Sequence, residues 1–127
     1  MRLALLLPAA LLSVAFGTTP ADAQRGRQTL CGWYENSSPG NHTIRDRARE
    51  WVIGAQGGFQ AAGIERIPEA PQSRWVRPGG PGSYGYGCYC MQASTNARAG
   101  RITRIHSARA VPLAQCRADR RLREPRY

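Results

Sequence analysis

The sequence predicts a small, mainly β domain held together by disulfide bonds: a compact antiparallel sheet or partial barrel with a short C-terminal helix, or else a small α+β fold. Three observations lead to this fold class. Four cysteines follow an N-terminal segment typical of exported proteins, short apolar segments alternate with turn-forming residues, and the one helical pattern lies near the C-terminus. A domain of this size buries a small core, so covalent cross-links matter to its stability.

Residues 1–23 have the organisation of a cleaved signal peptide. Arg2 precedes an uncharged apolar run at residues 3–16, and residues 21–23 (Ala-Asp-Ala) form a small-x-small cleavage site before Gln24. The apolar run is shorter than the roughly 20 residues that a transmembrane helix needs. We therefore expect a mature chain that begins at Gln24, has no transmembrane segment, and is periplasmic or secreted.

One ordered domain is expected after the signal peptide. A flexible lead-in at residues 24–29 precedes it, the domain itself occupies residues 30–119, and a basic, frayed tail follows at residues 120–127. The first strand is expected to be short and aromatic, around Trp33 and Tyr34, because a cluster of turn-forming residues at 36–41 favours a loop directly after it.

A hairpin is expected next, with strands at residues 43–46 and 50–56 joined by a turn. In the second of these strands, alternate apolar side chains share one face, namely Trp51, Ile53 and Ala55. Residues 59–83 include four prolines and show no clear periodicity, so they are expected to form a long surface loop. Trp75 and Val76 are its expected apolar anchor.

The clearest strand spans residues 84–94 and carries large side chains on both faces, so both faces are expected to be covered. One face presents Tyr84, Tyr86, Cys88 and Cys90, and the other presents Tyr89 and Met91. Gly85 and Gly87, which separate the tyrosines, indicate either the close approach of another backbone segment or a bulge.

A β-rich segment at residues 101–107 is expected to close a hairpin on this strand. Ile102 and Ile105 fall on opposite faces of a regular strand, and a bulge would bring them to the same face. Residues 113–123 favour a short C-terminal helix. The i, i+4 spacing of two charged side chains in it would allow them to pair, namely Asp119 and Arg123.

The cysteines predict two disulfide bonds. An even number in an exported chain is typical of a disulfide framework, here formed by Cys31, Cys88, Cys90 and Cys116. Cys88 and Cys90 leave one strand on the same side, and a bond between them would pinch the backbone. Two pairings remain open: 31–88 with 90–116, or 31–90 with 88–116. In the loop-entropy description each bond contributes about 3.5–4 kcal/mol.

Metal binding, redox activity and catalysis are weaker alternatives. The cysteines lack the Cys-x-x-Cys spacing of zinc sites, and a redox-active Cys-x-Cys would need a thiol of lowered pKa. Ser107, His106 and Asp46 could be combined on paper, but no nucleophile elbow or oxyanion loop accompanies them, and the other histidine, His42, stands in a loop. We expect no cofactor, no metal and no catalytic residue, and a protein that is not an enzyme.

The charge points to an anionic partner. All 18 basic residues are arginine and the formal net charge is +10, which removal of the signal peptide leaves unchanged because it takes away one arginine and one acid. GC-rich codon usage accounts for the absence of lysine but not for the net charge. A field of this sign attracts polyanions. Export favours lipopolysaccharide phosphates, anionic lipid headgroups or an acidic protein over nucleic acid.

Candidate binding residues lie in two places. The last eleven residues contain five arginines, namely Arg117, Arg120, Arg121, Arg123 and Arg126. Tyr84 and Tyr86 stand beside glycines that leave ring faces uncovered, and such faces can stack on a ligand. Trp33 and Trp51, in contrast, are expected in the core of the domain.

Four blocks of sequence resemble one known family. They are Cys-Gly-Trp-Tyr at residues 31–34, Gln-Gly-Gly at 56–58, Tyr-Gly-Tyr-Gly-Cys-Tyr-Cys at 84–90, and Pro-Leu-Ala-Gln-Cys-Arg at 112–117 followed by Asp119. Their joint order is similar to that of the small exported bacterial proteins known as domain of unknown function 4087. The resemblance implies export, a single domain and four paired cysteines, and it supplies no activity or catalytic residue.

These observations favour an exported, non-catalytic envelope domain that binds an anionic partner. The alternative from another functional class is an inhibitor of a secreted hydrolase that inserts the loop at residues 68–83 into an active-site cleft. Salt separates the two hypotheses, because binding of a polyanion should weaken steeply as ionic strength rises.

Overall fold

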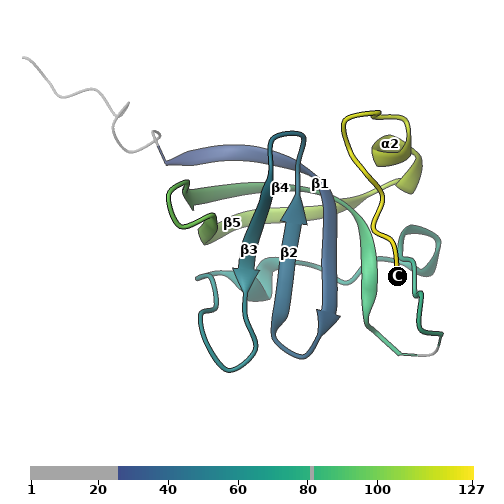
Figure 1. Ribbon diagram of the computed structural model, residues 1–127, viewed down its shortest axis with the longest axis horizontal. Helices are drawn as coiled ribbons and strands as arrows, with labels where there is room; N and C mark the ends of the chain where they lie inside the picture. Colours follow the sequence, from purple (N-terminus) through teal and green to yellow (C-terminus); the bar gives the residue numbers. More distant parts are fainter. Residues whose placement is uncertain (1–25, 81) are drawn as a thin grey trace, which may run out of the picture.

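The computed structural model describes residues 26–80 and 82–127. The expected signal peptide and the start of the mature chain at Gln24 lie outside this part. Five strands form the framework of the fold (Figure 1). They are β1 (Arg27–Ser38), β2 (Asn41–Arg45), β3 (Glu50–Gly54), β4 (Gly85–Asn96) and β5 (Arg101–Val111). Two single 3-10 turns, η1 (Ile64–Arg66) and η2 (Gln72–Arg74), lie in the long connection between β3 and β4, and α2 (Leu113–Arg117) follows β5.

The strands close into a barrel in the order β1-β2-β3-β5-β4, with β4 returning to β1. Neighbouring strands are antiparallel except β3 and β5, which meet in parallel at Val52 and Arg101. This is the strand order of the OB fold, a five-stranded Greek-key barrel. The prediction of a disulfide-stapled β domain with a short C-terminal helix is confirmed.

Strand β1 is much longer than the sequence predicts. It pairs with β4 from Arg27 to Asn36 and with β2 from Trp33 onward. The last residues of the expected lead-in therefore belong to β1, and most of the expected loop at 36–41 becomes strand around a tight turn. Asn36 pairs with both β4 and β2, and Ser38 pairs with β2, so strand pairing satisfies the backbone of residues that have little strand propensity of their own.

The side chains of the barrel form two separate cores. The inner core fills the barrel and includes Leu30, Tyr34, Trp51, Tyr89 and Met91. The outer core lies on the outside of β1 and β4 and contains Trp33, Tyr86, Cys88, Cys90, Val111 and Cys116. Both faces of β4 are thus covered, as the sequence predicts, and Trp33 and Trp51 are both buried.

The predicted bulge is present in the β4–β5 hairpin. The register shifts between Gln92 and Ala93 and again between Ser94 and Thr95. The shifts bring Ile102 and Ile105 into the barrel, where both are fully buried. Ala55, in contrast, lies beyond the end of β3 and is exposed, so the predicted third member of the Trp51 face is wrong.

Gly85 and Gly87 permit a close backbone approach, one of the two possibilities the sequence offers. Val76 and Tyr86 exchange two backbone hydrogen bonds of 2.8 and 3.0 Å. A Cβ atom on Gly85 would overlap the Val76 carbonyl, and one on Gly87 would lie 2.7 Å from the Arg74 carbonyl oxygen. The long connection has more apolar anchors than Trp75 and Val76, because Ile64 and Ile67 also pack on the inner core.

The C-terminal segment differs most from the prediction. The helix ends at Arg117, whereas the sequence predicts that it continues to residue 123. Asp119 accepts a hydrogen bond from the backbone amide of Arg121, which is a turn and not a helical contact. The predicted pair of Asp119 with Arg123 is also wrong, because Asp119 pairs with Arg47. Residues 118–127 then turn back toward the barrel (Figure 1). We call this segment the C-terminal strap. No helix in the described part of the chain is long and apolar enough to span a membrane.

Candidate functional site

The disulfide bonds are Cys31–Cys90 and Cys88–Cys116, the second of the two pairings that the sequence leaves open. Cys31 and Cys90 are direct partners in the β1–β4 ladder. Cys88 points from the same face of β4 to α2, so its bond ties the C-terminal segment to the barrel. The described residues contain no free cysteine and no group of three His, Cys, Asp or Glu side chains that could hold a metal ion.

Arginines from three distant parts of the chain meet on the outside of the barrel. Arg27 of β1 and Arg104 of β5 are both register partners of Ser94, which lies between them on β4. Arg66 of η1 reaches the same place and donates a hydrogen bond of 3.1 Å to the carbonyl oxygen of His106. We call Arg27, Arg66 and Arg104, with His106 at their centre, the basic face.

His106 is held as a neutral ring within the basic face. Burial, and then the charges of Arg27, Arg104 and Arg66, lower its pKa. An Arg27 guanidinium nitrogen lies 3.0 Å from His106 Nδ1 and must donate to it, so Nε2 carries the ring proton and donates to Ser94 Oγ at 2.8 Å. Both ring nitrogens are thus engaged by residues other than Ser107 or Asp46.

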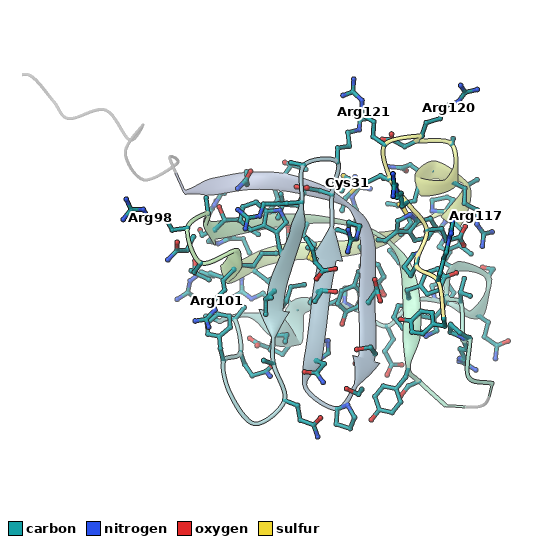
Figure 2. The ribbon with its side chains drawn as sticks, in the orientation of Figure 1. Cys31, Arg98, Arg101, Arg117, Arg120 and Arg121 are labelled. Atoms are coloured by element: carbon teal, nitrogen blue, oxygen red, sulfur yellow. A yellow bond between two sulfur atoms is a disulfide. The ribbon has the colours of Figure 1, made fainter. Side chains whose placement is uncertain are left out.

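The predicted binding arginines of the C-terminal strap are all exposed. Figure 2 shows Arg120 and Arg121 projecting into solvent from the loop after α2. Arg117 makes a 2.7 Å ion pair with Glu124, and its hydrogen bonds hold the pKa of that carboxyl below the usual range. Asp119 pairs with Arg47, so both acids of the strap pair with arginines outside it. Four arginines against these two acids leave the strap basic.

The strap is anchored to the barrel and is not frayed. Its contacts cover one of the two predicted binding tyrosines, Tyr86, whereas the other, Tyr84, stays accessible. The Tyr127 ring stacks on that of Tyr86 at 6.0 Å, and its hydroxyl donates to Glu35 at 2.8 Å. Tyr86 also donates to Glu124 and is only 6% exposed, so its ring is covered. Tyr84 is 45% exposed and keeps an accessible ring.

A second candidate site is a cavity of about 270 Å³ at the end of the barrel where β1 finishes. We call it the aromatic cavity. Three aromatic rings pack against one another in its wall. The centre of the Tyr34 ring lies 4.8 Å from that of Tyr89 and 6.0 Å from that of Trp75. The sequence identifies Trp75 as an anchor, but the cavity itself could not be predicted, because its wall combines β1, β4 and the β3–β4 connection.

The polar lining of the aromatic cavity comes from β1, β2 and the connection. Asn36 and His42 line it, and the exposed side chains of Glu69 and Arg77 complete its rim. The Tyr34 hydroxyl lies 2.7 Å from His42 Nδ1. Burial raises the pKa of Tyr34, and burial together with the Glu69 charge raises that of Tyr89 to about 12. Titratable groups with displaced pKa values in a preformed cavity are typical of binding sites.

His42 should make folding stability depend on pH. Burial lowers its pKa below the usual 6.5, so the unfolded chain takes up a proton at higher pH than the folded chain does. Stability should therefore fall as the pH drops below about 6.5. We expect the melting temperature of His42→Gln to fall less between pH 7.5 and 5 than that of the wild type. Parallel curves for the two proteins would contradict this.

Comparison with known proteins agrees with the resemblance seen in the sequence. The chain matches the family described as "Protein of unknown function (DUF4087)" over residues 25–123, a range that contains all five strands and α2. No curated protein and no solved structure matches the chain significantly. The family match covers most of the sequence, and this chain is therefore a member of the DUF4087 family of proteins of unknown function.

Proposed function

We propose that this protein is an exported, non-catalytic domain of the bacterial envelope that binds an anionic partner through its basic face. The observation that carries the proposal is the convergence of Arg27, Arg66 and Arg104 around one neutral histidine. Like charges repel one another, so a cluster of this kind is a feature that a bound anion would stabilise.

The ion pairs of the described residues lie outside the basic face. The ion pairs among the described residues join Arg45 to Glu50, Arg47 to Asp119 and Arg117 to Glu124. None of these pairs involves an arginine of the basic face. The strap has two acids among its ten residues, Asp119 and Glu124, which lower its net charge, whereas the arginines of the basic face converge on one histidine.

Export supports the choice of partner. Both disulfides would persist in an oxidising compartment such as the periplasm, and the sequence carries a signal-peptide pattern at residues 1–23. Phosphates of lipopolysaccharide and of lipid headgroups are anions of the bacterial envelope that a positive field attracts. We propose these phosphate-bearing polymers and surfaces as the partner, in preference to an acidic protein.

Two matched triple variants test the proposal. The first, Arg27→Gln/Arg66→Gln/Arg104→Gln, removes the basic face, and the second, Arg120→Gln/Arg121→Gln/Arg123→Gln, removes three charges from the strap. We expect the first to elute from immobilised heparin and from lipopolysaccharide at clearly lower salt, with a shallower dependence of retention on salt. The second should shift much less, although it loses the same charge.

The opposite order of elution would place the anion site on the strap, where the sequence analysis first places it. Equal shifts would mean that retention follows net charge alone, and the proposal of a specific face would be wrong. Circular dichroism of both variants checks that the fold is kept. All six arginines are exposed, so little destabilisation is expected from either set.

The inhibitor hypothesis has a narrower structural basis. Trp75 and Val76 tie the long connection to the barrel, and residues 77–80 and 82–84, which follow them, are exposed. Tyr84 is the large exposed ring in that part. An inhibitor acting through this segment should keep its affinity at salt concentrations that release a polyanion.

A further inference from the structure

We infer that the aromatic cavity binds one uncharged sugar ring, either a free monosaccharide or a single unit of a glycan. The inference does not depend on the proposed function, because the cavity includes Asn36 near the end of β1, whereas the basic face lies where β1 begins at Arg27. It is drawn from the walls of the cavity, from its polar groups and from its size.

The walls of the cavity are fixed before any ligand arrives. Trp75 donates its indole N–H to the Ser83 carbonyl at 3.2 Å. Its ring packs so closely on Gly87 of β4 that a Cβ atom added to this glycine would lie 3.0 Å from the ring. Tyr89 donates its hydroxyl to the Pro68 carbonyl at 2.8 Å and so holds the opposite side of the connection. A site with such preset walls binds a ligand without first having to order its own side chains.

The polar groups of the cavity suit hydroxyls better than a charged ligand. Glu69 and Arg77 stand on the same rim with opposite charges, and neither belongs to an ion pair among the described residues. Glu69 would repel an anion and Arg77 would repel a cation. A hydroxyl, in contrast, can donate a hydrogen bond to Glu69 and accept one from Arg77. Asn36 and His42 add an amide and an imidazole, groups that an acyl chain would leave without hydrogen bonds.

The aromatic surface and the volume complete the argument. The half-buried Trp75 ring offers an apolar surface for the C–H groups of a sugar ring, and the almost wholly buried Tyr34 and Tyr89 pack against it. The polar atoms of the three rings contact neighbouring protein groups. The cavity, at about 270 Å³, is slightly below the range of roughly 300–1,000 Å³ that drug-sized ligands occupy. It therefore accommodates one ring and not an oligosaccharide.

The test is a titration of the full-length mature, oxidised protein, labelled with ¹⁵N, against the methyl glycosides of glucose, galactose, mannose, rhamnose and N-acetylglucosamine. We expect at least one glycoside to give saturable shifts of the Trp75 indole N–H and of the His42 and Ala70 amides. The indole signals of the buried Trp33 and Trp51 should stay unchanged. Glu69→Gln and Arg77→Gln should each weaken binding about tenfold, as expected for loss of a charge-assisted hydrogen bond.

Glu65→Gln is the matched control, because it removes an exposed acid from the same connection without lining the cavity. It should bind as the wild type does. If none of the five glycosides binds, or if the shifts map to another surface, the inference is wrong. Saturable binding of decanoate in the cavity without any glycoside would also overturn it, in favour of an apolar ligand. A failed glycoside titration would leave heparin retention by the basic face unaffected.

Discussion

Replacing Trp33 with alanine is expected to destabilise the protein by about 3–5 kcal/mol, the usual cost of removing a large aromatic side chain from a core. Trp33 is fully buried, although it points out of the barrel. Its ring meets Tyr86 edge-on at 5.5 Å, and Leu113 and Leu122 pack on the same outer core. Alanine would leave a cavity that this rigid sheet face, with its two disulfides, cannot close.

Trp33→Phe separates the packing of this side chain from its polarity. The indole nitrogen of Trp33 is buried and has no hydrogen-bond partner among the described residues, so phenylalanine removes an unsatisfied donor together with part of the volume. We expect Trp33→Phe to cost clearly less than Trp33→Ala in urea denaturation. A loss below about 1 kcal/mol for Trp33→Ala would show that the outer core is not a stabilising element.

Loss of the Cys88–Cys116 bond should also have a large effect, and one that is specific to the C-terminal strap. In the loop-entropy description, a bond across a sequence separation of 28 contributes about 3.5 kcal/mol. Its partner segment, α2, has five residues and is too short to be stable alone. We therefore expect Cys88→Ala/Cys116→Ala to be destabilised by a few kcal/mol and to release the C-terminal strap from β4.

Limited proteolysis with trypsin reads out this release directly, because the strap contains four exposed arginines, namely Arg120, Arg121, Arg123 and Arg126. Cleavage in the strap should accelerate strongly in Cys88→Ala/Cys116→Ala. The matched control is Cys31→Ala/Cys90→Ala, which removes a bond between strands that the β1–β4 ladder already joins. That control should lose global stability, about 4 kcal/mol by the same description, without selective cleavage of the strap. Equal cleavage in both variants would mean that Cys116 does not hold the strap.

Much of the fold follows from local sequence patterns. Alternation along residues 84–94 predicts a strand that is covered on both faces, and β4 has this property because its side chains enter both cores. The misfit between Ile102 and Ile105 predicts the bulge that buries both side chains. Gly85 and Gly87 indicate a close backbone approach or a bulge, and the segment at Val76 makes this approach. These features can be read from the sequence because each depends on a few adjacent residues.

Other features depend on contacts between distant residues, and only the tertiary structure decides them. The cysteine framework follows from composition, but the choice of Cys31–Cys90 depends on the β1–β4 register. The strap packs on the barrel because Tyr127 stacks on Tyr86 and donates a hydrogen bond to Glu35, which lies 92 residues earlier in the chain. The basic face forms because the same ladders bring Arg27 and Arg104 to either side of Ser94. Composition and alternation are local properties, whereas register is a property of paired strands. For this reason the sequence predicts which strands form, and the closed barrel determines which side chains meet.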